Sequence, residues 1–111
     1  MFLEETEISN EEKFDNLAIV GTCKMLEKPY LRLTSTPNSE SVRPKKVLRR
    51  ALRLLKQKWK QHSADWAYIS EQLMSIRQDL TVQHVKDKFT VEVYEMNARL
   101  ALEVHDLAAF V

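Results

Sequence analysis

The sequence predicts an all-α fold, an antiparallel helical hairpin stack of solenoid-like type preceded by an extended linker. Its 111 residues include one glycine and three prolines, too few for the many turns of an all-β domain. Between residues 44 and 104, apolar side chains recur at intervals of three and four, which is the spacing of one buried helical face. The composition, 44% apolar and 30% charged, is typical of a globular protein.

The sequence also limits the compartment and the cofactors. It has no run of about 18 uncharged apolar residues, and its start, MFLEETE, is acidic where a signal peptide is basic. We therefore expect a soluble, intracellular protein with no membrane contact. Cys23 is the single cysteine, which excludes an intrachain disulfide, and no pair of histidines or cysteines has the spacing of zinc ligands. No metal or other cofactor is expected.

The first 43 residues lack clear helical periodicity. Residues 1–18 are acidic and are predicted to form a mobile tail or a short helix near the basic segment. Residues 19–43 contain Gly21, Pro29, Pro37 and the polar run TSTPNSES, which cannot continue a helix. They are predicted to form the extended linker.

A first helix is predicted from about Pro44 to Gln61, because proline suits the first helical turn. Its apolar face is Leu48, Leu52, Leu55 and Trp59. Five basic residues fall within roughly 80° of arc beside that face, at about 100° per residue. These residues, which we call the basic ridge, are Lys45, Arg49, Arg53, Lys56 and Lys60.

Two further helices and the start of another follow. The second, capped by Ser63 or Asp65, has the clearest apolar repeat: Trp66, Ile69, Leu73, Ile76 and Leu80. A break is predicted at Thr81-Val82-Gln83. The third helix carries Val85, Phe89, Val93, Met96, Leu100 and Val104, and DLAAFV begins a fourth, capped by Asp106. Because the third helix exposes apolar surface without the fourth, we expect the amino-terminal part of a larger solenoid.

The triplet Arg77-Gln78-Asp79 combines a base, an amide and an acid at the predicted end of the second helix. We interpret it as structural. Asp79 is expected to accept backbone N–H bonds that begin the next helix, and Arg77 to reach carbonyls at the end of its own helix or an acidic neighbour. Glu92 and Glu95, three residues apart, are typical of a solvated helix face. No catalytic residue is assigned, and the chain is predicted not to be an enzyme.

Positive charge is concentrated in residues 41–64, which carry nine basic residues and no acidic one. Two interpretations of the basic ridge are open. It is either a solvated helix face or, since uncompensated like charges repel, a site for an anionic group. The candidate anions are phosphates of RNA, an acidic protein partner, or residues 4–15 of the same chain.

Three segments, IVGTCKMLEKPYLRLTSTPNSESVRP, SIRQDLTVQ and FTVEVYEMNARLALE, resemble the Sac-three/GANP domain family over about residues 19–106. The resemblance is to the branch of leukocyte receptor cluster member eight and yeast Thp-three. It implies a helical stack followed by a PCI-type winged helix, so residues 19–111 would be a partial domain. In this family context the triplet would be a hydrogen-bonded turn that fixes how the second and third helices cross.

The resemblance also implies a function. The leading hypothesis is a non-enzymatic, nuclear scaffold in mRNA processing, transcription-coupled mRNP biogenesis or mRNA export. The implied partners are a second PCI protein and a small acidic subunit of the proteasome-lid type. The alternatives are a direct RNA-binding module that uses helix 44–61, and a truncated gene product without autonomous function.

Overall fold

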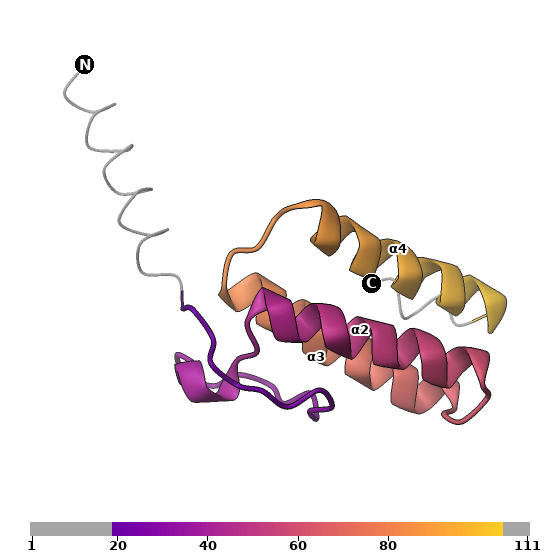
Figure 1. Ribbon diagram of the computed structural model, residues 1–111, viewed down its shortest axis with the longest axis horizontal. Coiled ribbons are helices and arrows are strands. Elements are labelled where there is room, and N and C mark those ends of the chain that lie inside the picture. The colour runs from indigo at the N-terminus through magenta and orange to yellow at the C-terminus, as the bar shows by residue number, and fades with distance from the viewer. Residues whose placement is uncertain (1–18, 106–111) are drawn as a thin grey trace, which may run out of the picture.

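Three antiparallel α-helices form the body of the molecule in a computed structural model that describes residues 19–105 (Figure 1). A short 3₁₀ helix, η1 (Ser39–Ser41), precedes α2 (Lys45–Lys60), α3 (Trp66–Val82) and α4 (Lys88–Glu103). Residues 19–105 contain no strand, and the predicted all-α helical stack is confirmed. The predicted tail, residues 1–18, and the fourth helix capped by Asp106 lie outside the described residues.

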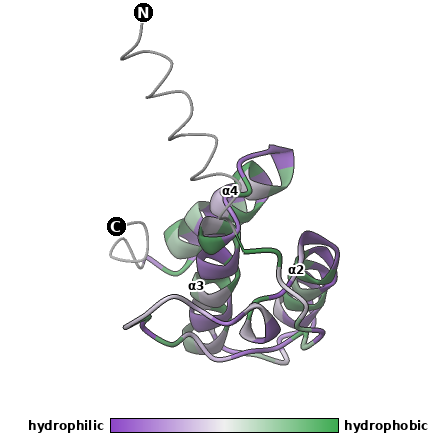
Figure 2. Ribbon diagram, turned by 90° about the vertical axis from the view of Figure 1, so that its left-hand side faces the viewer, coloured by the Kyte–Doolittle hydropathy of each residue, from purple (hydrophilic) through white to green (hydrophobic). Residues whose placement is uncertain are grey.

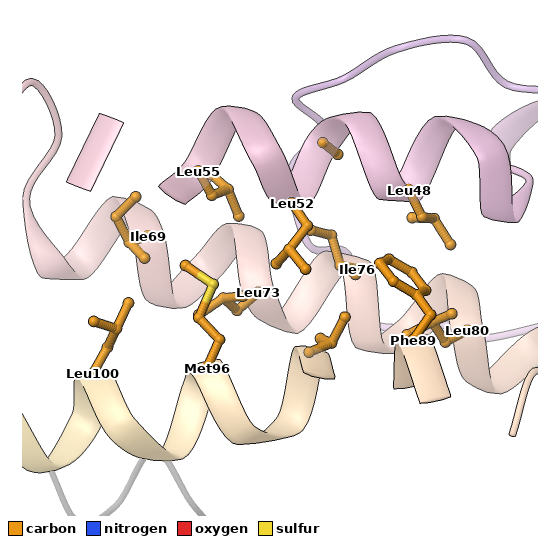
Figure 3. Close-up of a cluster of buried hydrophobic side chains, with 12 residues drawn as sticks. Leu48, Leu52, Leu55, Ile69, Leu73, Ile76, Leu80, Phe89, Met96 and Leu100 are labelled. Atoms are coloured by element: carbon orange, nitrogen blue, oxygen red, sulfur yellow. The ribbon is translucent and has the colours of Figure 1, made fainter. Parts of the chain in front are cut away.

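The core lies between all three helices. α3 packs against both α2 and α4, and the turned view shows these two helices beside it (Figure 2). The predicted apolar faces meet there, although Trp59, Trp66 and Val85 are only partly buried at the edge of the core. The predicted core position of Val104 was wrong, because this residue is the C-cap of α4 and lies outside the core cluster. Figure 3 shows how the side chains interdigitate. The buried cluster is Leu48, Ala51, Leu52, Leu55, Ile69, Leu73, Ile76, Leu80, Phe89, Val93, Met96 and Leu100.

Aspartates begin the second and third α-helices. The Asp65 side chain accepts a hydrogen bond from the Tyr68 backbone N–H at 2.9 Å, and Asp87 accepts from the N–H groups of Phe89 and Thr90. Each bond satisfies an amide that has no partner within the helix. α4 therefore begins at Lys88, and the prediction that Val85 lies within this helix was wrong.

Each of the three α-helices described in residues 19–105 is followed, after its C-cap residue, by a histidine in the left-handed backbone region. His62, His84 and His105 have φ of 55°, 57° and 59°. Glycine is the usual residue here, but the chain's single glycine lies elsewhere. After α3, the Val85 N–H bonds the Leu80 carbonyl and the His84 N–H bonds that of Thr81, which is a Schellman motif. The predicted break at Thr81-Val82-Gln83 was wrong by two residues, because Thr81 and Val82 are still helical.

Residues 19–43 form a packed layer on the helices (Figure 1). Their two ends lie together, because the Cys23 N–H bonds the Val42 carbonyl at 2.9 Å and the Thr22 N–H bonds that of Ser39. A Cβ at Gly21 would lie 2.2 Å from the Val42 carbonyl oxygen, far inside van der Waals contact. The only glycine of the chain therefore permits this close approach of two backbone segments.

Replacing Ile76 tests the packing of α3. Its side chain has 0% exposure in the core, so Ile76→Ala should lower the free energy of unfolding by about 2 to 5 kcal/mol. Met74→Ala, on the same helix but 40% exposed, is the matched control and should cost about 0.5 kcal/mol or less. Urea denaturation measures both. Equal effects of the two changes would contradict the described burial of α3.

Candidate functional site

A buried ion pair connects α3 to the segment before α2. The Arg43 side chain has 0% exposure and Asp79 has 1%, and Arg43 Nε donates to Asp79 Oδ2 at 2.8 Å. Lys28 Nζ donates to the other carboxylate oxygen, also at 2.8 Å. The remaining guanidinium nitrogens bond the Leu26 carbonyl and the Ser75 hydroxyl. The buried charges are thus paired and hydrogen-bonded, as stable burial requires.

Glutamine side chains of α3 and its cap extend this attachment by pairing with backbone groups. The Gln72 side chain accepts a hydrogen bond from the backbone N–H of Lys28 and donates one to the backbone carbonyl of Lys28. Gln78 donates to the Leu31 carbonyl. Gln83 donates to the Arg43 carbonyl and accepts from the Gly21 N–H. α3 therefore has an apolar face toward the other helices and a polar face toward residues 19–43.

Residues 19–43 are attached to the helices at a second place, near the other end of α2 and α3. There Glu27 contacts Lys58 of α2 and Tyr68 of α3. The hydrogen bond from Lys58, followed by that from Tyr68, holds the pKa of the Glu27 carboxyl below its usual value. The pKa of Tyr68 is raised to about 12, mainly by burial and next by the hydrogen bond to Glu27. Lys58 also lies 5.2 Å from the centre of the Tyr68 ring.

The triplet Arg77-Gln78-Asp79 lies inside α3, so its predicted position at a turn was wrong. Asp79 does not cap the next helix, a role that Asp87 fills. Of the three residues, only Arg77 reaches α4, where its guanidinium lies 4.7 Å from the centre of the Tyr94 ring. Gln78 and Asp79 instead hold residues 19–43. The triplet belongs mainly to the polar face of α3.

The basic ridge is partly neutralised by α4, which corrects the expectation of uncompensated charge. Lys45 pairs with Asp87 and Lys56 with Glu92. The hydrogen bond from Lys45 is the main reason why the pKa of Asp87 is lowered. Arg49 lies over the Phe89 ring, 5.9 Å from its centre. Arg53 and Lys60 are exposed, and neither has an ion-pair partner within residues 19–105.

A groove opens between α2 and α4 beside the ridge. Its volume is about 450 Å³. Arg49, Leu52 and Arg53 of α2 line one wall. Lys88, Phe89 and Glu92 of α4 line the other. The spacing on α2 placed Arg49 and Arg53 beside its apolar face, but no groove was predicted, because the contribution of Lys88 depends on how the helices pack.

Residues 19–105 contain no group of three or more histidine, cysteine, aspartate or glutamate side chains placed to hold a metal ion. No helix among them is long and apolar enough to span a membrane. Within the described residues, the groove combines unpaired basic side chains with an opening of about 450 Å³.

Comparison with known proteins identifies the family of the chain. The family model described as SAC3/GANP family matches residues 3–109. The chain belongs to the SAC3/GANP family. A THP3 homolog of Schizosaccharomyces pombe is 51% identical over 96 residues, which is 86% of this chain and 24% of that protein.

Two more relatives are similar to much of this chain. Protein THP3 of Saccharomyces cerevisiae is 43% identical over 103 residues, covering 92% of this chain and 22% of that protein. A leukocyte receptor cluster member 8 homolog of Xenopus laevis is 46% identical over 97 residues, covering 87% of this chain and 12% of the homolog. The chain thus spans about a quarter or less of the length of these curated relatives.

Replacing Asp79 tests the buried pair. Asp79→Ala leaves Arg43 buried without its carboxylate, so it should lower the free energy of unfolding by about 3 to 5 kcal/mol. Glu71→Ala is the control, since the exposed Glu71 accepts a single bond from the Tyr30 N–H, and it should cost about 1 kcal/mol or less. Thermal denaturation compares them. Equal midpoints would show that the Arg43–Asp79 pair does not hold the segment.

Proposed function

We propose that this chain is a non-enzymatic scaffold of the SAC3/GANP type that acts in nuclear mRNA processing, mRNP biogenesis or mRNA export through protein contacts. The observation that carries the proposal is the family match over residues 3–109. The role itself comes from the resemblance of the IRQDLTVQ and FTVEVYEMNARLALE segments to that family. The partners that this resemblance implies are a second PCI protein and a small acidic subunit.

The outer surface of α4 supports a scaffold role. Val91, Tyr94 and Leu102 are all exposed on it, and with Ala98 they follow helical spacing on the side away from the core residues Val93, Met96 and Leu100. A helix with an apolar stripe on each side is suited to the middle of a stack, because each stripe accepts another element. This surface supports assembly by helix packing.

Co-expression tests the proposal. The tagged chain would be produced with a PCI protein and a small acidic subunit, and the mixture separated by size-exclusion chromatography with light scattering. We expect one complex that contains all three chains. Val91→Glu combined with Leu102→Glu places charge on the outer stripe and should weaken that complex at least about tenfold.

Gln57→Glu is the control for this experiment, since it adds charge at an exposed position of α2. It should leave the complex intact. If the chain elutes alone while the other two proteins still bind each other, the proposal fails. A nuclear signal from the fluorescently tagged chain is expected, and exclusion from the nucleus would contradict the proposed compartment.

A further inference from the structure

The α2–α4 groove is where positive charge without a carboxylate partner collects. Arg49 and Arg53 face it from α2, and Lys88 faces it from α4. Within residues 19–105, none of these three cations has a carboxylate at ion-pair distance. The one acidic side chain of the groove, Glu92, is already bonded to Lys56. An incoming anion would therefore meet three unpaired cations.

Two backbone amides at the start of α4 are not available to an anion in the groove. The amides of Phe89 and Thr90, in the first turn of α4, are already bonded to the Asp87 carboxylate, and Lys45 in turn pairs with Asp87. A ligand in the groove would consequently be held by the two guanidinium groups and the ammonium group. Guanidinium forks match the two oxygens of a carboxylate or a phosphate.

The form of the groove favours a carboxylate on a peptide over single-stranded RNA. Single-strand binding uses exposed aromatic faces on which bases stack. The aromatic ring of this groove, Phe89, is only 5% exposed, and the Arg49 guanidinium lies over it. Leu52 is buried beside it. The groove thus offers cations over an apolar floor, which suits an acidic side chain together with the aliphatic part of a peptide.

We infer that the α2–α4 groove is a docking site for an acidic peptide segment of a protein partner, whose carboxylates are bound by Arg49, Arg53 and Lys88. The inference rests on the proposed function in one respect, namely that the partner is a protein. It goes further in naming the chemistry of the partner and the residues that select it. Lys45 and Lys56, already paired with α4, would help to fix the walls.

A direct binding assay tests the inference without the complex. The probe is a fluorescently labelled peptide of alternating aspartate, glutamate and leucine residues, and the comparison peptide has asparagine and glutamine in place of the acids. Fluorescence anisotropy with the full chain should detect the acidic peptide alone. Arg49→Gln combined with Arg53→Gln should weaken binding by at least about tenfold. Lys88→Gln, on the opposite wall, should also weaken it.

Lys46→Gln combined with Arg50→Gln is the matched control, because it removes the same charge from exposed positions of α2 that do not line the groove. It should change the affinity less than about threefold. Circular dichroism should show little change in melting for any variant, since all the replaced side chains are exposed and an exposed cation–π contact such as that of Arg49 with Phe89 contributes little to stability. Equal loss in the groove and control variants would overturn the inference, because it would indicate a general charge effect.

Labelled oligouridine provides the remaining comparison. If it binds more tightly than the acidic peptide and depends on the same groove residues, the groove is an RNA site and the inference is wrong. This assay is independent of the co-expression experiment. Peptide binding without a complex would therefore defeat only the proposed scaffold role, and a complex without peptide binding would defeat only the proposed docking site.

Discussion

The Asp79 carboxylate organises the amino-terminal part of the described chain. It is buried and bonded to Arg43 and Lys28, and neither cation belongs to the helix that carries it. Buried ions lose their hydration, so this arrangement is stable only while every partner stays in place. The pair therefore couples two features that would otherwise be separate, the path of residues 19–43 and the entry of the chain into α2. Gly21 and the glutamines of α3 complete that coupling.

α3 connects this layer to the hydrophobic core. Its apolar face packs on α2 and α4, while Gln72, Ser75 and Asp79 lie buried toward residues 19–43. α2 and α4 are each held to α3, and the groove lies between them. The positions of Arg49 and Lys88 thus depend on packing against a common helix. In the proposed docking of an acidic peptide, the rigidity of that core would keep the cations in place.

Apolar spacing was sufficient to predict the three helices and the α3 residues Ile69, Leu73, Ile76 and Leu80, since one buried face repeats every three or four positions. The polar face was not predicted, because its partners lie 32 to 62 residues away and polar residues at those positions are equally typical of a solvated surface. Arg43 was counted only as one more basic residue. The basic ridge on α2 was predicted from the spacing of its residues. The opposite wall of the groove, on α4, depends on how the helices cross. Local sequence patterns do not determine the angle at which two helices cross.

Hydrogen exchange of individual amides tests most directly whether residues 19–43 belong to the folded unit. The N–H groups of Gly21, Cys23 and Lys28 are bonded to Gln83, Val42 and Gln72, and Ile76 of α3 reports on the core. If the buried pair joins the layer to the core, these amides should exchange with opening free energies close to that of Ile76. Exchange of all three at the rate of an unprotected chain, with Ile76 still protected, would contradict the central role of Asp79.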